Sequence, residues 1–387
     1  MQDISFYFQP TQLATEELAS DSIGKYIETH TDEYFPQLDK KGIALISVPE
    51  YRNSHVANFN YKASTDFRNS FYQLYIGSNW KCKIYDLGTI QPGKEISDTY
   101  HALSQVVEVL LKKNIIPLII GGSNDLIFSI YRGYEKLEQL VNITSIDASL
   151  DLGDTEEALH NNGWLSKILT HEPCNLFNFS NLSAQSHYIS PTVLQLIDEL
   201  YFDITRLGTL SNDLKLAEPT LRNTDLASFD LTAIRASDIK GIQYKQPNGL
   251  FAHEACKISH YAGISDKLTS FGIFEYYPET AHPVTNELVA QLIWYFIEGY
   301  ANRKGDFPIG NKKTYTTFRV TFDEMEEEMV FYKSDKSGRW WMEVPYPESR
   351  TTKYQRHHLV PCSYEDYQLA MQGEVPNLWW KTYQKLA

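Results

Sequence analysis

Residues 115–125 read IIPLIIGGSND, and this stretch sets the fold class. Its six apolar residues end abruptly at Gly121-Gly122, which is typical of a buried strand followed by a tight turn. Similar short apolar runs recur along the chain between stretches of helical periodicity, at residues 42–48, 83–87, 141–147, 174–179, 225–230 and 268–274. Short apolar strands that alternate with helices predict a mainly parallel sheet with helices on both faces, a three-layer α/β/α architecture.

The composition changes along the chain and predicts three parts. Residues 1–39 form an N-terminal extension, and residues 40–305 form the α/β domain, closed by a helix over 286–303. Residues 306–387 are acidic and aromatic-rich, and a hairpin around Asp335–Gly338 predicts a β-rich C-terminal extension. The acidic run Asp323–Glu328 is interpreted as a solvated face, and His357-His358 as an exposed pair.

The overall charge excludes some classes of partner. Lys and Arg number 35 against 49 Asp and Glu, so the net charge is −14. Nucleic-acid binding usually needs a basic face, so a nucleic-acid partner is not expected. No apolar run approaches the ~18 residues of a membrane span. The four cysteines are far apart, and the N-terminus is unlike a secretory signal, so we expect a cytoplasmic protein.

Polar residues follow three of the predicted strands at the point where each ends. They read GGSND at 121–125, SIDASLD at 145–151 and SFDLT at 228–232. Residues two apart in extended backbone point to the same side. Because chemistry in parallel α/β sheets is found at the carboxyl ends of strands, these residues are the candidate site.

These motifs resemble the ureohydrolase superfamily, which includes arginase, agmatinase and formimidoylglutamase. Its members carry GGxH, DAHxD and SxDxDxxDP at three strand ends, and these supply two His and four Asp to a dinuclear manganese site. The segments Ile43–Asn53 and Glu275–Pro278 also resemble an early and a late segment of the family. The resemblance covers residues 40–305 in the right order and spacing, and it implies an arginase-like fold.

This chain departs from the family motifs at half of the ligand positions. Asn124 and Ser149 stand where the family has His, and Thr232 and Arg235 stand where it has Asp. The metal-ligand candidates that remain are Asp147, Asp151 and Asp230. Two close metal ions concentrate four positive charges, which neutral Asn, Ser and Thr oxygens neutralise poorly. An inward-pointing Arg235 would instead pair with a leftover carboxylate as a fixed cation.

Three alternatives follow for the site. The first has no dinuclear metal, with the three aspartates capping strand ends or bonding to Arg235. The second holds a single cation such as Mg²⁺ or Mn²⁺. The third is a dinuclear site completed by other residues, with His160 and Asp125 as candidates. No cofactor is therefore expected, or manganese if the site is intact.

Two further residues are catalytic candidates by resemblance. Glu275 matches the family position that grips a guanidinium or formimino group, and its structural alternative is a strand-end salt bridge. His160 lies near a substrate-side histidine of the family, and its alternative is an ordinary loop histidine.

Two functions therefore compete. One is a pseudoenzyme that has lost the dinuclear manganese site and serves a binding or assembly role. The other is an active metal-dependent C–N hydrolase acting on a formimino or guanidino substrate. The resemblance implies a homo-oligomer, while the C-terminal extension is a possible surface for a protein partner.

Overall fold

A ten-stranded sheet forms the centre of the computed structural model, which describes residues 3–12, 17–54, 66–242, 246–277, 282–308, 312–322, 328–346 and 355–386. The strands are β1 (Phe8–Gln9), β2 (Glu28–Thr29), β3 (Gly42–Val48), β4 (Lys83–Ile90), β5 (Ile115–Gly121), β6 (Val141–Ile146), β7 (Leu176–Ala184), β8 (Asp203–Arg206), β9 (Leu226–Asp230) and β10 (Ser270–Phe274). Their spatial order is β1-β4-β3-β5-β10-β9-β6-β7-β8, with β2 also on β4. Among the described strands of this sheet, only β1 runs antiparallel to its neighbour, so the predicted mainly parallel sheet is confirmed.

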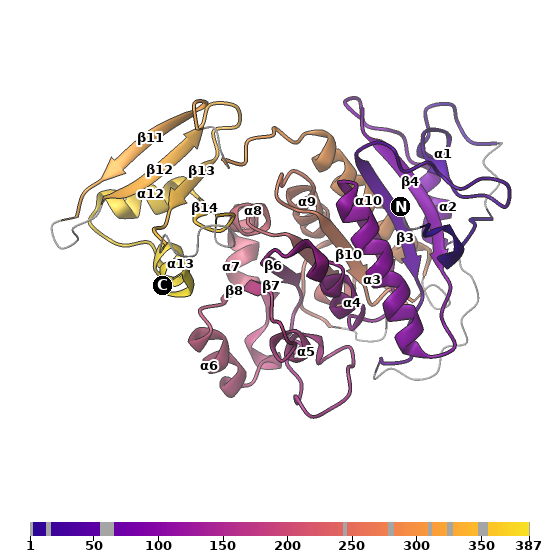
Figure 1. Cartoon of the computed structure of the whole chain (residues 1–387), viewed down its shortest axis with the longest axis horizontal. Helices are drawn as coiled ribbons and strands as arrows, with labels where there is room; N and C mark the ends of the chain where they lie inside the picture. Colours follow the sequence, from indigo (N-terminus) through magenta and orange to yellow (C-terminus); the bar gives the residue numbers. More distant parts are fainter. Residues whose placement is uncertain are drawn as a thin grey trace.

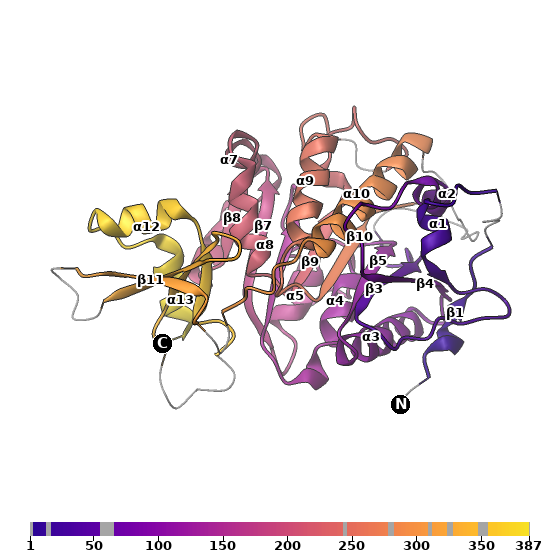
Figure 2. The ribbon, with the colours of Figure 1, turned by 90° about the horizontal axis from the view of Figure 1, so that it is seen from above.

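Helices cover both faces of this sheet (Figures 1 and 2). The helices that pack on one face are α1 (Ile23–Tyr26), α2 (Asp66–Gln73), α7 (Leu207–Asn212), α8 (Ala217–Arg222), α9 (Ala252–Gly263) and α10 (Pro283–Ala301). The helices that pack on the other face are α3 (Ile96–Lys112), α4 (Leu126–Arg132), α5 (Trp164–Leu169) and α6 (Pro191–Glu199). In the part of the chain that the structure describes, no helix is long and apolar enough to cross a membrane.

Local sequence explains why β5 ends where it does. The strand is apolar and fully buried, because helices pack on both of its faces. Gly122 follows, and its backbone N–H donates to the Val48 carbonyl at 2.8 Å. A Cβ atom at residue 122 would lie 1.9 Å from the Glu50 carbonyl oxygen, so only glycine fits this close approach. The turn after β5 is thus drawn against the end of β3.

The C-terminal extension is a second, smaller layer structure. Its antiparallel sheet has the order β11 (Tyr315–Val320), β12 (Met329–Ser334), β13 (Trp340–Glu343) and β14 (Leu359–Cys362). Strands β12 and β13 form the predicted hairpin. Helices α12 (Tyr364–Met371) and α13 (Asn377–Leu386) pack on the sheet through an aromatic core and were not expected from the sequence. The acidic run lies outside the described residues apart from Glu328.

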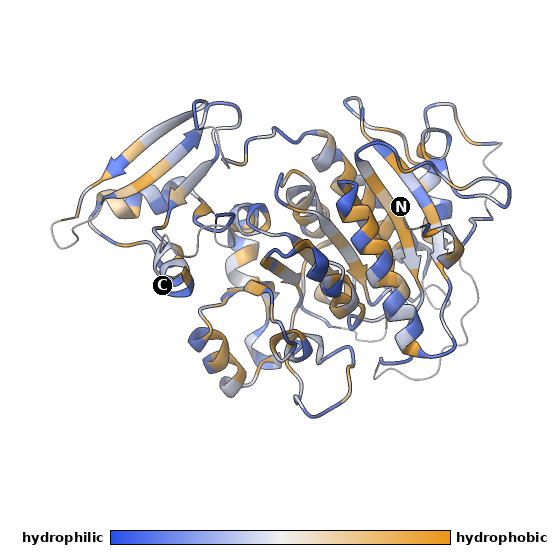
Figure 3. Cartoon of the chain, viewed as in Figure 1, coloured by the Kyte–Doolittle hydropathy of each residue, from blue (hydrophilic) through white to orange (hydrophobic). Residues whose placement is uncertain are grey.

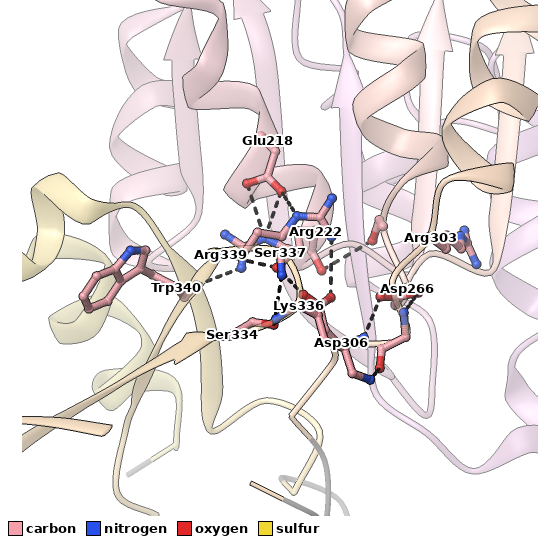
Figure 4. Close-up of polar contacts among 12 residues, drawn as sticks. Glu218, Arg222, Asp266, Arg303, Asp306, Ser334, Lys336, Ser337, Arg339 and Trp340 are labelled. Carbon is pink, nitrogen blue, oxygen red and sulfur yellow. Dashed lines mark hydrogen bonds and ion pairs between the residues drawn. The ribbon is translucent and has the colours of Figure 1, made fainter. Parts of the chain in front are cut away.

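Buried charges join the extension to the central sheet (Figure 4). Arg222, at the end of α8, donates to the carbonyls of Trp340 at 2.8 Å and Cys362 at 3.0 Å. Arg356 pairs with Asp225 at 2.8 Å, directly before β9. The extension therefore contacts the amino ends of the central strands and leaves their carboxyl ends to other segments.

The interpretation of His357 as exposed is wrong. Its side chain is buried, with its ring 4.1 Å from that of Phe177. Burial lowers the pKa of His357 well below its usual range. His357 is buried because the extension docks on the central sheet. Its partner Phe177 belongs to β7 of that sheet and lies 180 residues earlier in the chain.

Candidate active site

The polarity of β6 and β9 rises towards their carboxyl ends. Along β9, alternate residues are Leu226, Ser228 and Asp230, and along β6 they are Ile143, Ser145 and then Asp147 just beyond the strand. Ile143 and Leu226 pair in register, as do Ser145 and Ser228. Because paired residues share a face, apolar, hydroxyl and carboxylate layers follow one another up the sheet. This register brings Asp147 and Asp230 to the same edge.

A buried carboxyl cluster lies at that edge, and we define it as Asp147, Asp151, Asp230 and Glu275. Every member is at least 95% buried. Burial, followed by repulsion from the neighbouring carboxylates, raises the pKa of Asp151 to about 8 and that of Glu275 to about 8. The pKa of Asp230 is raised to about 6 and that of Asp147 well above its usual range, again mainly by burial.

Asn124 lies inside the carboxyl cluster, in the turn that follows β5. Its side-chain Nδ2 donates to Asp230 Oδ2 at 2.5 Å and to Asp151 Oδ2 at 3.5 Å. Its backbone N–H donates to Glu275 Oε1 at 3.1 Å. Its own Oδ1 is buried and has no hydrogen-bond partner among the described residues. Asn124 therefore links three of the four carboxyl groups.

Other donors in the chain complete the bonding of the aspartates. The Trp164 indole N–H, at the start of α5, donates to Asp151 Oδ2 at 2.6 Å. The Ser149 backbone N–H donates to Asp147 Oδ1 at 3.1 Å, and the Ser149 hydroxyl lies 3.3 Å from Asp147 Oδ2. The Thr232 backbone N–H donates to Asp230 Oδ1 at 2.6 Å. Ser149 and Thr232 thus lie at the site as N–H and O–H donors.

Glu275 is held in a strained backbone conformation, with φ of 57° directly after β10. Its Oε2 accepts a hydrogen bond from the Tyr277 hydroxyl, and Oε1 is bonded to Asn124. The Tyr277 ring lies 5.1 Å from that of Tyr51. Both carboxyl oxygens of Glu275 are therefore engaged within the chain. Pro278 of the family-like turn lies outside the described residues.

The two residues considered for completing a metal site lie in different surroundings. Asp125 is fully buried and accepts hydrogen bonds from the hydroxyls of Ser123 and Tyr100. Burial raises its pKa to about 6. His160 Nε2 lies 3.0 Å from Glu157 Oε2 in the loop before α5. No group of three or more His, Cys, Asp or Glu residues arranged to hold a metal ion occurs among the described residues.

Arg235 does not pair with the carboxyl cluster. Its guanidinium forms an ion pair with Asp238 at 2.8 Å and lies 3.6 Å from the centre of the Phe251 ring. The interpretation of Arg235 as a replacement positive charge is therefore wrong. Residues 231–233 form a 3₁₀ turn after β9, and the chain then turns Arg235 towards the start of α9.

Sequence reasoning missed Trp164, Tyr277 and Tyr100. Each donates to a carboxylate at the end of a strand, from 2 to 25 positions away along the chain. An aromatic residue in an apolar stretch looks the same whether its N–H or O–H is used or not, so the pattern held no signal for these roles.

The fold and the site define an α/β protein with a cluster of buried acidic side chains at the carboxyl ends of its parallel strands. A model of the arginase family matches residues 61–298, and the chain belongs to the arginase family. The resemblance to the ureohydrolase superfamily is thereby confirmed.

The relatives found include formimidoylglutamases. That of Bacillus subtilis (strain 168) is 24% identical over 283 residues, which is 67% of this chain and 88% of the relative. That of Streptococcus gordonii (strain Challis) is 23% identical over 239 residues, 56% of this chain and 71% of the relative.

Solved structures confirm the arginase-like fold. The crystal structure of the B. subtilis formimidoylglutamase has a TM-score of 0.64 at 18% identity, covering 76% of this chain and 95% of that one. The Trypanosoma cruzi formiminoglutamase with manganese has a TM-score of 0.62 at 18% identity, covering 73% and 99%. The crystal structure of arginase from B. subtilis has a TM-score of 0.55.

Proposed function

We propose that this arginase-family chain is a formimidoylglutamase-like pseudoenzyme, in which N–H and O–H donors have replaced the dinuclear manganese site, and that it serves a binding or assembly role. The observation that carries this proposal is the Asn124 side-chain amide, which donates towards both Asp151 and Asp230. A metal ion between these carboxylates would need the same lone pairs. Hydrogen bonding to Asn124 and coordination of a metal ion therefore compete for the same carboxylate oxygens.

The donor set does not fit a pair of manganese ions. Manganese favours carboxylate and imidazole ligands. Here Asp147 already accepts a hydrogen bond from Ser149, and Asp230 accepts one from Thr232. Without a metal ion, the raised pKa values of Asp151 and Glu275, about 8 each, favour protonated carboxyls near neutral pH. Bound protons and N–H dipoles then hold the carboxyl groups together.

One observation favours the alternative, an active metal-dependent hydrolase acting on a formimino or guanidino substrate. No residue in the described part of the chain donates to Asn124 Oδ1, which is buried, and a buried acceptor of this kind is costly. A flipped Asn124 amide would bring this oxygen against two carboxylates, which is favourable only with a cation between them. Under this alternative, Glu275 would have to release Tyr277 in order to reach a substrate.

The test is the metal content of the purified full chain after dialysis against excess Mn²⁺ and removal of free metal, measured by elemental mass spectrometry. We expect essentially no manganese. About two manganese ions per chain would overturn the proposal. The B. subtilis formimidoylglutamase, treated identically, is the comparison.

A second readout is thermal unfolding with and without Mn²⁺. We expect Mn²⁺ to leave the Tm of the wild type and of Asp147→Asn unchanged. A rise in the wild-type Tm that Asp147→Asn abolishes would assign Asp147 to a metal and favour the hydrolase.

A further inference from the structure

The antiparallel sheet of the extension has two edges, and they lie in different surroundings. Strand β14 forms one edge, and Arg222 of the central domain donates to its Cys362 carbonyl at 3.0 Å. Strand β11 forms the other edge and pairs with β12 alone among the described strands. Figure 1 shows β11 on the outside of the extension, away from the central sheet. An edge strand of this kind offers its outer backbone groups to another strand.

The register between β11 and β12 shows which backbone groups of β11 point outwards. The Asp335 N–H donates to the Thr314 carbonyl at 3.0 Å, and this pair continues the register of the two strands. Hydrogen-bonded pairs alternate along an antiparallel ladder, so every second residue of β11 counted from Thr314 bonds to β12. Thr317 and Arg319 lie between these residues and therefore direct their N–H and C=O groups towards the open edge.

The sequence of β11 favours pairing with another strand. Residues 315–320 are mostly Tyr, Thr, Phe and Val, which are strong β-formers, and they include no Pro or Gly. The only charged side chain on the strand, Arg319, is paired with Glu328 at 2.9 Å. Thr317 is exposed, and Phe318 is half-buried on the side covered by α12. Figure 3 shows hydrophobic and hydrophilic residues alternating along the strand. β11 thus lacks the prolines and unpaired charges by which edge strands commonly resist pairing.

We propose that β11 pairs antiparallel with β11 of a second copy of this chain, about a two-fold axis at Phe318, and joins the two four-stranded sheets into one. Thr317 then exchanges two backbone hydrogen bonds with Arg319 of the partner subunit, and the symmetry repeats this pair. Phe318 meets Phe318 of the partner subunit where the two strands approach most closely, which makes an aromatic contact. The inference rests on the assembly role proposed above.

The neighbouring registers fit worse. An axis at Arg319 would set two guanidinium groups opposite each other, which is unfavourable. An axis at Thr317 would set Tyr315 opposite Arg319 of the partner subunit, but the Tyr315 N–H already donates to the Lys312 carbonyl at 3.2 Å. The second copy is favoured over an unrelated extended segment, because the outward residues and the aromatic contact are symmetric about Phe318.

Sedimentation equilibrium of the full chain tests for the dimer. Two short paired strands bury little surface, so we expect a Kd on the order of 10 μM. Thr317→Pro removes an outward N–H from each copy and no hydrogen bond to β12, and it should weaken the dimer by about tenfold or more. Its control is Thr317→Val, which keeps the N–H and should dimerise like the wild type. Circular dichroism should show that both variants are folded.

Charged side chains at residue 317 test the register. Thr317 lies opposite Arg319 of the partner subunit in the proposed pair, so Thr317→Glu should strengthen the dimer and Thr317→Lys should weaken it, each by about threefold or more. The control makes the same changes at Thr209, an exposed residue of α7. At that position the net charge of −14 predicts the opposite order, since an added Lys reduces the repulsion between copies.

Three results would overturn the proposal. The first is a chain that stays monomeric at about 200 μM. The second is a dimer that survives Thr317→Pro, because another surface would then hold it, and the third is a dimer that Thr317→Glu weakens. The metal content is measured on the same preparation. A dimer that retains manganese would contradict only the pseudoenzyme proposal, whereas a metal-free monomer would contradict only the pairing of β11.

Discussion

Trp164 shows how much the carboxyl cluster depends on a single donor. Its indole N–H bonds to Asp151, a carboxyl group buried away from water. Replacing Trp164 by Phe keeps an aromatic ring and removes the donor. We expect Trp164→Phe to lower the free energy of unfolding by about 1–3 kcal/mol more than a matched Trp→Phe change that loses no hydrogen bond. Chemical denaturation measures this.

The matched control is Trp341→Phe. Trp341 is also fully buried, but within the part of the chain that the structure describes its Nε1 has no hydrogen-bond partner. Phe at position 341 keeps an aromatic ring beneath the Arg222 guanidinium, which lies 4.4 Å from the centre of the Trp341 ring. Both substitutions remove the same indole atoms, so the difference between them reports mainly on the Asp151 bond. The double variant Trp164→Phe, Asp151→Asn should show a coupling energy of the same size. Equal losses for the two Trp variants would contradict the assigned role of Trp164.

At the scale of an element, helix α13 is held on the central sheet by a partly buried lysine. Lys385 Nζ donates to Asn178 Oδ1 of β7, and burial lowers the pKa of Lys385 to about 8. In the unfolded chain the same lysine has its ordinary pKa of about 10.4. Between these values the unfolded state binds more protons, so the free energy of unfolding rises with pH. Below pH 8, Lys385 is charged in the folded state too, so the cost of burying its ammonium lowers the free energy of unfolding in full.

We therefore expect Lys385→Met to remove a rise of about 1–2 kcal/mol between pH 8 and pH 9.5, measured by urea denaturation at each pH. Lys381→Met, on the same helix, is the control. Lys381 is an ion-pair partner of Asp203 and should leave the rise in place. An identical pH slope in wild type and Lys385→Met would show that this lysine is not buried as a charge.

At the scale of the whole molecule, buried charges couple the extension to the α/β layers. Arg222 is 4% exposed, bonds to two carbonyls of the extension and pairs with Glu218 at 3.1 Å. Its guanidinium also lies 4.4 Å from the centre of the Trp341 ring. Breaking a buried pair of this kind costs about 3–5 kcal/mol. The extension is therefore expected to unfold together with the central sheet.

Differential scanning calorimetry tests this coupling. The wild type should show one transition with equal calorimetric and van't Hoff enthalpies. Arg222→Met should lower the Tm and divide the trace into two transitions. Arg319→Met is the control, because Arg319 forms an exposed pair with Glu328 and should change the Tm little. Two transitions already in the wild type would contradict the coupling.

Local sequence pattern was enough to predict the parallel sheet, seven of its strands and the chemistry available at their ends, whereas the short strands β1, β2 and β8 were not predicted. A short run in which every residue is apolar, such as Ile115–Ile120, is typical of a strand buried on both faces. Such burial requires helices on both faces of the sheet. Strand β7 was predicted too short, since its polar second half reads as a loop. The resemblance of three motifs to the ureohydrolase superfamily was enough to locate Asp147, Asp151, Asp230 and Asn124 at the site.

What each of these side chains does depends on the packing of distant elements. Hydrogen bonds from Trp164 to Asp151 and from Tyr277 to Glu275, the turn of Arg235 towards Asp238, and the burial of His357 all follow from where other elements lie. A local pattern reports which face of an element is apolar. It does not report which distant donor meets a carboxylate, because that contact is made by the tertiary arrangement of the whole chain.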